Sequence, residues 1–368
     1  MQSVKEMTKE RDFTFDVARA LCILEIVCFW HITNYIDISL VQERFFTIFG
    51  YVTVSVLGTF SFISGFFLKK YMIENVSDVG KFFLVRIKRF WILYFIASLL
   101  LYVASNCVGQ PWFPSISNFI LSLIGLSVFF QPLPATLWFM VMMMFFYLIT
   151  PLILAFRRKG HRVLIAITIY AALLALGYKG WVDDRVLCYY PMYALGLLLD
   201  VSIVDFIKRN ALLAILGSSV VLTLIYLFLY GSQFYPLLVC VVGLIAIIGL
   251  SELMTKSAII GKVGSFVSYS SLSMYFFHRH FYLVIVFIWN IGAVGIIREA
   301  TFPIWFAYLV VCPIIIFGCY MIQRIYDSFV QKMVGKDGRL FECNKFRTMT
   351  VKHSGTTVSV TGDSRRIK

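Results

Sequence analysis

The sequence has few charged residues for its length. Only 14% of its 368 residues are Asp, Glu, Lys or Arg, whereas 60% are hydrophobic. Soluble proteins use about 25% charged and about 45–50% apolar residues, so this composition excludes a soluble domain. The apolar residues also lack the alternation, in segments of about ten residues, that a membrane β-barrel requires. What remains are long unbroken apolar runs, which predict an all-α polytopic membrane protein.

Cysteine pairs with a functional spacing are also absent. The eight cysteines are scattered, mostly within apolar runs, and none has a CxxC or metal-ligand spacing. We therefore expect small core residues, with no metal site and no redox centre. Acidic residues are scarce too, since 19 Asp and Glu stand against 33 Lys and Arg, for a net charge of +14. Cytoplasmic loops of membrane proteins carry such an excess, so the charge does not indicate nucleic-acid binding.

No small-residue cleavage site follows the first apolar run, so a retained helix is expected there and not a signal peptide. The positive-inside rule places every basic cluster on the cytoplasmic side if one short run, 116–130, does not span. That run contains Gly125 and is bounded by prolines, which suits a re-entrant or interfacial segment. We predict ten transmembrane helices with both termini cytoplasmic. The eleven apolar runs are 14–36, 46–68, 82–105, 116–130, 137–156, 162–178, 186–200, 211–230, 234–253, 266–290 and 302–323.

The first run is unusual because it carries Arg19, Glu25 and His31 at membrane depth. A charged side chain there costs about 2.5–3.5 kcal/mol on insertion scales, so a simple anchor would not contain one. A regular helix would turn Arg19 and His31 about 120° apart, unless a π-bulge absorbs one extra residue. Arg19 would pair with Asp16 if it only reaches the membrane surface. Glu25 would either neutralise one of the two cations or take part in a reaction.

Basic residues gather at the start of the third run. Arg86 and Arg89 are three residues apart, which places them on one face of a regular helix. In one reading these arginines have no role beyond the positive-inside rule, by which cytoplasmic cations orient a membrane helix. Beside Lys69, Lys70 and Lys88 they would also suit a phosphate-rich ligand that enters from the cytoplasm, because arginine binds phosphate in a bidentate manner.

Three other places carry polar or aromatic groups in apolar surroundings. Ser64 precedes Gly65 in the second run, where small residues permit close helix packing or contribute to a site. Trp138 opens the fifth run and suits either the interfacial aromatic belt or a binding site. His278 and Arg279, with a second histidine after them, require either a water-filled cavity or a surface position.

In their order along the chain, these motifs resemble the acyltransferase-3 family of integral membrane O-acyltransferases, over about residues 12–328. That family has an Arg and a His in its first helix and a Ser-Gly-Phe motif ending its second. Arginines open its third helix, a Leu-Trp-Phe motif precedes a helix that ends in Pro, and a Ser…Tyr…His motif comes late. The matching residues are Arg19, His31, Ser64, Gly65, Phe66, Arg86, Arg89, Leu137, Trp138, Phe139, Pro151, Ser273, Tyr275 and His278.

The resemblance implies an enzyme that moves an acyl group, usually acetyl from acetyl-CoA, onto a hydroxyl of a glycan or lipid-linked sugar. A base must then take the hydroxyl proton, and histidine has the pKa for this near neutrality, so His31 is the expected base. Arg19 or Arg279 would hold the donor or stabilise the oxyanion. The expected catalytic residues are His31, Arg19 and His278, and the expected substrate- and donor-binding residues are Arg86, Arg89, Ser64, Trp138, Arg279 and Glu25.

The expected setting is the bacterial inner membrane, with acyl-CoA, a glycan acceptor, membrane lipid and glycan-assembly proteins as partners. Two other classes of function stay open. A transporter or flippase of a lipid-linked sugar would move its substrate without an acyl donor. A non-catalytic scaffold would depend on neither His31 nor His278.

The chain becomes polar and basic after the last apolar run, which predicts a membrane domain at 1–330 and a short irregular tail at 331–368. The segments VGKDGRLFECNKFRTM and GDSRRI resemble the region that follows the membrane helix of bacterial phosphoglycosyl transferases. The catalytic Asp-Glu pair of that family would lie beyond Lys368, so the tail is not expected to transfer sugar phosphate by itself. It is expected to be either a fragment from a glycan-assembly setting or a disordered cytoplasmic tail.

Overall fold

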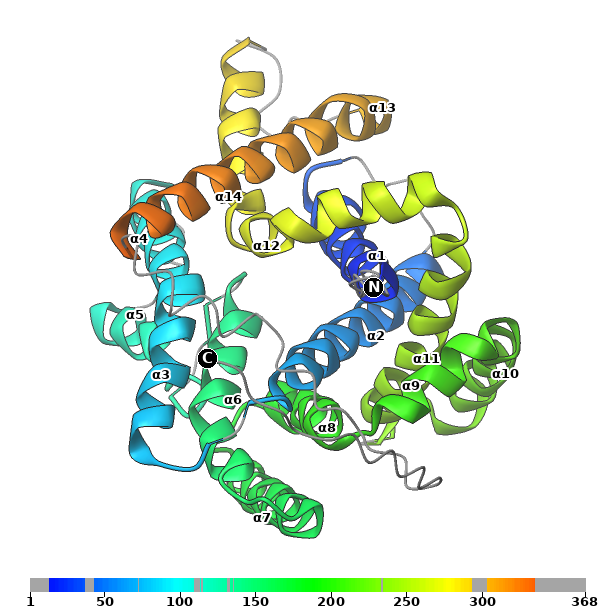
Figure 1. Ribbon diagram of the computed structural model, residues 1–368. Helices are drawn as coiled ribbons and strands as arrows, with labels where there is room; N and C mark the ends of the chain where they lie inside the picture. The colour runs from blue at the N-terminus through cyan, green and yellow to red at the C-terminus, as the bar shows by residue number, and fades with distance from the viewer. Residues whose placement is uncertain are drawn as a thin grey trace, which may run out of the picture. The chain divides into compact units, whose positions relative to one another are not determined.

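The computed structural model describes residues 13–36, 43–71, 73–108, 113, 115–130, 133–134, 136–232, 234–292 and 303–334. Within these residues every regular element is a helix, which confirms the predicted all-α membrane fold (Figure 1). One compact unit covers Met1–Tyr326. Positions 335–368, which hold nearly all of the predicted tail, lie outside the described residues, and the predicted division at 330 stays a prediction.

In three of the apolar runs, π or 3-10 segments interrupt the α-helices. The helical segments are α1 (Phe13–Leu24), η1 (Glu25–Trp30), η2 (His31–Asn34), α2 (Glu43–Leu68), α3 (Val76–Arg86), η3 (Ile87–Trp91), α4 (Ile92–Val108), α5 (Ile116–Leu123), α6 (Trp138–Leu154), α7 (Lys159–Tyr178), α8 (Asp184–Leu198), α9 (Val201–Arg209), α10 (Ala211–Leu229), α11 (Tyr235–Thr255), α12 (Ala258–Gly292), α13 (Ile304–Phe306), η4 (Ala307–Val311) and α14 (Cys312–Val334).

Seven helices of the described chain are long and apolar enough to cross a membrane. An eighth span results if the bent pair of α8 and α9 counts as one. The first apolar run is divided among α1, η1 and η2, and α6 has 17 residues. The count of ten spans and the cytoplasmic termini therefore stay predictions. α5 has 8 residues and rises about 12 Å, which by itself is too short to cross a hydrocarbon core of about 30 Å.

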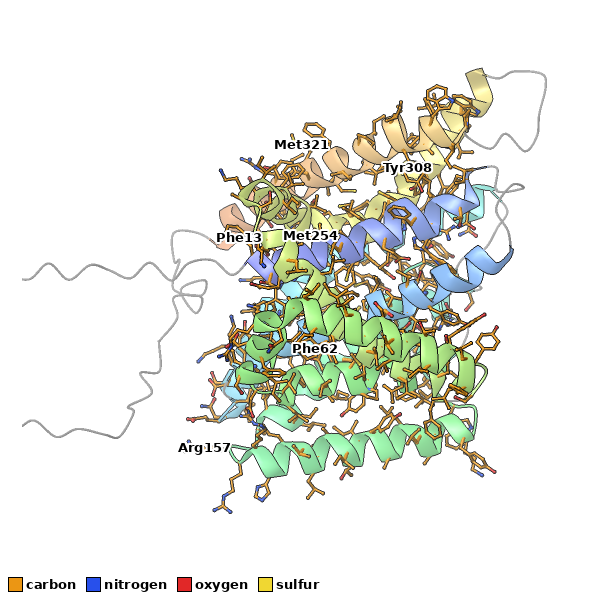
Figure 2. All side chains as sticks on the ribbon, turned by 90° about the vertical axis from the view of Figure 1, so that its right-hand side faces the viewer. Phe13, Phe62, Arg157, Met254, Tyr308 and Met321 are labelled. Atoms are coloured by element: carbon orange, nitrogen blue, oxygen red, sulfur yellow. The ribbon has the colours of Figure 1, made fainter. Side chains whose placement is uncertain are left out.

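Apolar side chains cover the outward surfaces of α7 and α10. Leu164 and Ile167 on α7, like Leu213 and Leu227 on α10, are exposed, and Figure 2 shows such side chains projecting outward from the bundle. In a soluble protein a surface of this kind would have to be covered. Here it is the surface expected to contact lipid.

Two glycines allow α2 and α8 to pack closely. A Cβ atom on Gly65 would lie 2.2 Å from the backbone oxygen of Tyr193, and one on Gly196 would lie 2.1 Å from the backbone oxygen of Phe62. No side chain fits at these distances, because the obstacle in both cases is backbone. The glycine of the Ser-Gly-Phe motif therefore serves helix packing.

Replacing Gly196 by alanine is expected to force α2 and α8 apart and to lower the free energy of unfolding by about 1–3 kcal/mol. Thermal unfolding of the purified protein in detergent measures this change. Gly217→Ala on α10 is the matched control, because a Cβ atom there meets nothing within 4 Å. Equal melting temperatures for the two variants would show that the close contact between α2 and α8 is not required.

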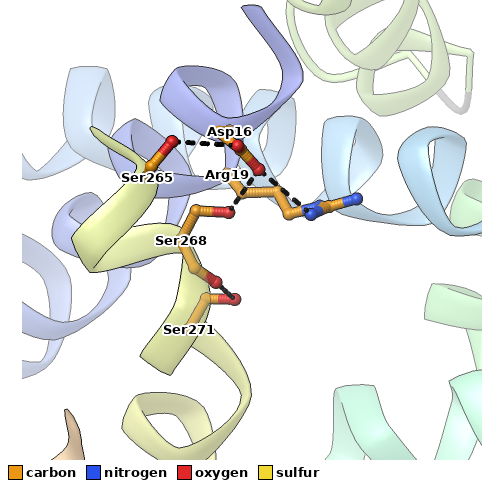
Figure 3. Close-up of polar contacts among 5 residues, drawn as sticks. All are labelled: Asp16, Arg19, Ser265, Ser268 and Ser271. Carbon is orange, nitrogen blue, oxygen red and sulfur yellow. Dashed lines mark hydrogen bonds and ion pairs between the residues drawn. The ribbon is translucent and has the colours of Figure 1, made fainter. Parts of the chain in front are cut away.

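α1 lies against α12, and buried polar groups fix the contact near the start of α1. The carboxylate of Asp16 accepts hydrogen bonds from Ser265 at 3.0 Å and from Ser268 at 3.2 Å (Figure 3). A Cβ atom on Gly264 would lie 3.2 Å from the Cα atom of Val17, so the two backbones approach closely. This contact fixes α1, which leads through η1 to His31, against α12, which carries His278.

Candidate active site

The first apolar run contains a π-bulge, the condition under which its spacing would let Arg19 and His31 share one face. The π-helix η1 spans six residues, and the backbone N–H of His31 donates to the carbonyl of Ile26, five residues earlier. Absorbing one extra residue leaves about 20° between Arg19 and His31, in place of about 120°. The irregular backbone thus changes the direction of the His31 side chain relative to α1.

His31 and His278 meet at the contact between η2 and α12. Nδ1 of His31 lies 2.7 Å from Nε2 of His278, and the two rings are 4.6 Å apart and 13° from parallel. His278 is fully buried, and its Nδ1 lies 2.8 Å from the backbone oxygen of Met274. His31 is half-buried. The sequence predicts both residues as catalytic, and the structure shows that they form one pair.

The hydrogen-bond partners of the ring nitrogens show which nitrogen of each histidine carries a hydrogen. A carbonyl oxygen only accepts, so Nδ1 of His278 carries a hydrogen and donates to Met274. In a neutral ring Nε2 of His278 is then an acceptor, and Nδ1 of His31 must donate to it. Nε2 of His31 is left as the basic nitrogen, and it has no hydrogen-bond partner among the described residues. This arrangement fixes one tautomer of His31 and presents its base outward from the pair.

Arg279 and two tyrosines surround the pair. Arg279 lies within electrostatic reach of His31 and within hydrogen-bonding reach of the Tyr35 hydroxyl. Tyr35 stacks on Tyr282 at 4.5 Å between ring centres, and the Tyr282 hydroxyl donates to the backbone oxygen of Val27 at 2.8 Å. The sequence analysis missed both tyrosines. The spacing of four residues from His278 to Tyr282, which places them on one helical face, is the signal that points to the second.

Arg19 lies toward the other end of the first run. Its Nη1 is 3.6 Å from the Asp16 carboxylate, and its guanidinium lies 4.7 Å from the ring centre of Phe67. Figure 3 shows the Arg19 side chain extending away from the serines of α12 that bind Asp16. The pairing with Asp16 is therefore present, and twelve residues, or about 18 Å of helix, separate Arg19 from His31. A direct contact of Arg19 with the histidine pair does not form.

Glu25 is buried between α1 and α2 and does not neutralise either cation. One carboxylate oxygen accepts from the Thr53 hydroxyl at 2.7 Å, and the other is buried without a hydrogen-bond partner in the described part of the chain. Arg19 pairs with Asp16 instead. Of the two alternatives for Glu25, the structure shows no ion pair with Arg19 or His31 among the described residues, and its carboxylate faces Thr53 on α2.

Arg86 and Arg89 differ in exposure, and whether they share one face stays a prediction. The π-helix η3 follows Arg86 directly, and its wider turn leaves Arg89 exposed. Arg86 is half-buried among the rings of Tyr71, Phe82 and Tyr147, at 5.3, 5.4 and 5.6 Å from its guanidinium carbon. Its Nε is buried, and no described residue accepts a hydrogen bond from it. Arg86 therefore offers a donor that an anion entering between these rings would satisfy.

A model of the acyltransferase-3 family, described as an acyltransferase domain, matches residues 12–324. The chain belongs to the acyltransferase-3 family. The match contains the histidine pair, Arg19 and Arg86, so the site described above lies within the family's domain. It ends before the tail, whose resemblance to phosphoglycosyl transferases stays a prediction. Searches of curated proteins and of solved structures give no match.

The remaining predicted residues of this acyltransferase lie in separate places. Ser64 is half-buried on α2 beside the packing glycine, and no hydrogen bond to its side chain forms among the described residues. The guanidinium carbon of Arg185 lies 4.4 Å from the ring centre of Trp138. The ring centres of Trp138 and Tyr189 are 6.0 Å apart. The sequence analysis did not include Arg185. Nor do the described residues include a group of three or more His, Cys, Asp or Glu able to hold a metal ion.

Two lysines follow α2, and the second, Lys70, lies within electrostatic reach of Arg86. Nζ of Lys69 donates to the backbone oxygen of Leu199 at 3.0 Å and lies 3.5 Å from the ring centre of Phe66. Burial lowers the pKa of Lys69 to about 8, although the charge of Asp200 acts in the opposite direction. Burial, together with the charges of Arg86 and Arg89, also lowers the pKa of Lys70. Cationic side chains are thus concentrated where α2 ends and η3 begins.

The lowered pKa of Lys69 predicts early reaction with amine reagents. Below pH 8 the side chain is mainly protonated, and above it the neutral amine reacts, so half-maximal labelling is expected at about pH 8. Competitive labelling with acetic anhydride, read by mass spectrometry, measures the midpoint against a lysine model peptide in the same tube. A midpoint shared with the model peptide would show that Lys69 is not desolvated.

Proposed function

We propose that this membrane acyltransferase moves an acyl group, in the first place acetyl, from acyl-CoA to a hydroxyl of a cell-surface polysaccharide or lipid-linked glycan. One observation supports the reaction most strongly. The hydrogen bonds from His31 to His278 and from His278 to Met274 leave Nε2 of His31 as an oriented base in a partly buried place. Ester formation from a thioester needs such a base, because a sugar hydroxyl is a weak nucleophile until its proton is removed.

In the proposed step the acceptor hydroxyl gives its proton to Nε2 of His31 while its oxygen attacks the thioester carbonyl. His31 then carries a positive charge, and the lone pair of His278 Nε2 that accepts from Nδ1 stabilises it. Arg279, within electrostatic reach of His31, stabilises the negative carbonyl oxygen. The carbon–sulfur bond breaks, the CoA sulfur leaves, and it takes the proton back from His31. One ester and one free thiol result.

Arg86 and the lysines near it are the proposed donor site. The buried Nε of Arg86 has no acceptor in the described residues, and Lys70 and Arg89 place two further cations near it. Phosphate is the part of acyl-CoA that would use such donors. The aromatic rings around Arg86 suit the adenine base. Arg19, on the face that the bulge aligns with His31, is the proposed contact along the donor between its phosphates and its thioester.

The proposed setting is the inner membrane of a bacterium, where glycan assembly supplies both the acceptor and the partner proteins. The basic tail, which resembles a fragment of a phosphoglycosyl transferase, supports this setting.

The test is transfer of label from radioactive acetyl-CoA in membrane vesicles that contain the protein. Glycan extracted from cells lacking the gene serves as the acceptor, and hydroxylamine-sensitive label on the glycan measures ester formation. We expect label above that of vesicles without the protein. Movement of a lipid-linked sugar across the vesicle membrane with no acyl donor, and no ester formed, would instead support the flippase alternative.

A further inference from the structure

An ion pair with two hydrogen bonds stands at the start of α8. The carboxylate of Asp183 accepts from Nε and from Nη2 of Arg185, each at 2.7 Å, and also from the backbone N–H of Arg185 at 2.9 Å. The backbone N–H of Asp183 donates to the carbonyl of Val128 at 3.1 Å. Asp183 is buried, whereas 41% of the Arg185 side chain is exposed. The carboxylate therefore holds one edge of the guanidinium and leaves the other edge accessible.

The same guanidinium lies over an aromatic ring. Its carbon is 4.4 Å from the ring centre of Trp138, the residue that opens α6. Trp138 is half-buried and contacts the rings of Phe139 and Tyr189. Two segments far apart in sequence thus combine a fixed donor edge and its carboxylate with an indole.

This unit lies next to the histidine pair. The hydroxyl of Tyr275 donates to the backbone oxygen of Thr136 at 3.0 Å, two residues before Trp138, and its ring is 6.2 Å from the ring of His278. Arg185 is within electrostatic reach of Tyr275. The hydroxyl of Thr136 is buried and has no hydrogen-bond partner in the described part of the chain. A buried hydroxyl without a partner is rare, and a ligand that enters here would satisfy it.

The charges decide which ligand fits. Asp183 and Arg185 together carry no net charge, so the pair does not attract an anion as the cations near Arg86 do. The free edge of the guanidinium, which Asp183 fixes, donates, the unpartnered Thr136 hydroxyl donates or accepts, and an indole packs against the C–H face of a sugar ring. Adjacent hydroxyls on a neutral sugar both donate and accept, and they match this set.

We infer that Asp183, Arg185 and Trp138 bind the acceptor as an acceptor clamp, which recognises a neutral, hydroxyl-bearing sugar ring and directs it past Thr136 toward His31. This inference rests on the proposed function and adds to it the residues that select the acceptor. It also assigns the donor and the acceptor to different residues, with phosphate at Arg86 and sugar at Arg185.

The vesicle assay separates these two sites when the half-saturating concentrations of glycan and of acetyl-CoA are measured independently. Arg185→Gln is expected to raise the half-saturating concentration of glycan about tenfold, because a charge-assisted donor is lost. That of acetyl-CoA is expected to stay within twofold. Arg185→Lys is expected to raise the glycan value as well, since an ammonium group lacks the planar fork that engages the carboxylate and a sugar together.

Lys179→Gln is the matched control, because it removes one exposed cation just before Asp183 that does not contact Trp138. A half-saturating concentration does not depend on the fraction of folded protein, so poor folding of a variant cannot imitate the result. If both Arg185 variants bind glycan as Lys179→Gln does while wild-type transfer depends on His31, the clamp is wrong and the proposed function stands. If the wild type forms no ester, the proposed function fails, and the clamp fails with it.

Discussion

Replacing His31 by glutamine is expected to lower the rate of acyl transfer by about 10²–10⁴-fold, the usual contribution of a positioned base. Glutamine approximates the size of the ring, so helix packing is retained. It cannot accept the hydroxyl proton, because an amide is not a base near neutral pH. Transfer of label from acetyl-CoA to glycan under saturating donor and acceptor measures the effect.

The control for this variant is His161→Gln, which changes an exposed histidine at the start of α7. It should transfer label at the wild-type rate. A His31→Gln protein that is folded, present in equal amount and as active as His161→Gln would show that the proton is removed elsewhere.

Replacing Arg86 by glutamine is expected to raise the half-saturating concentration of acetyl-CoA roughly 10- to 100-fold, the value of one or two charge-assisted hydrogen bonds to phosphate. The rate at saturating donor should change much less, because Arg86 lies at the other end of the donor from the reacting carbonyl. Arg86→Lys should give an intermediate value, since it keeps the charge but loses the planar fork.

The matched control for Arg86 is Arg158→Gln, which removes an exposed arginine at the start of α7. A dephosphorylated donor, 3′-dephospho-acetyl-CoA, gives a second comparison. If Arg86→Gln leaves the affinity for both donors within twofold of the wild type, the phosphates are bound by other residues.

The sequence predicts the elements of the site better than their contacts. The spacing of twelve residues in the first run leaves a regular helix and a bulged one open, and the structure has the bulge as η1. The pairing of His31 with His278 depends on how α1 packs against α12, which joins residues 247 positions apart, and no local pattern reports this. The expectation of one face for Arg86 and Arg89 assumes a regular helix, whereas the π-helix η3 begins directly after Arg86.

Glu25 shows a different limit of the sequence. Charge balance along one helix allows Glu25 a partner in Arg19 or His31 or a role in the reaction, whereas the structure gives it the hydroxyl of Thr53 on α2. No pattern in the sequence marks Arg185 either, because its contacts also come from tertiary packing. Its significance comes from the carboxylate and the indole that tertiary packing brings to it, and not from its position in the chain.

The most direct test of the central claim is the single-turnover rate of acyl transfer in two variants of His278. Glutamine places its side-chain oxygen near the position of Nε2, where it accepts from Nδ1 of His31 and keeps the tautomer. Asparagine is too short to reach His31, although it retains a donor toward Met274. We expect the rate of His278→Gln to stay within about tenfold of the wild type, whereas that of His278→Asn falls about 100-fold or more. Equal rates for the two variants would contradict an oriented His31 base.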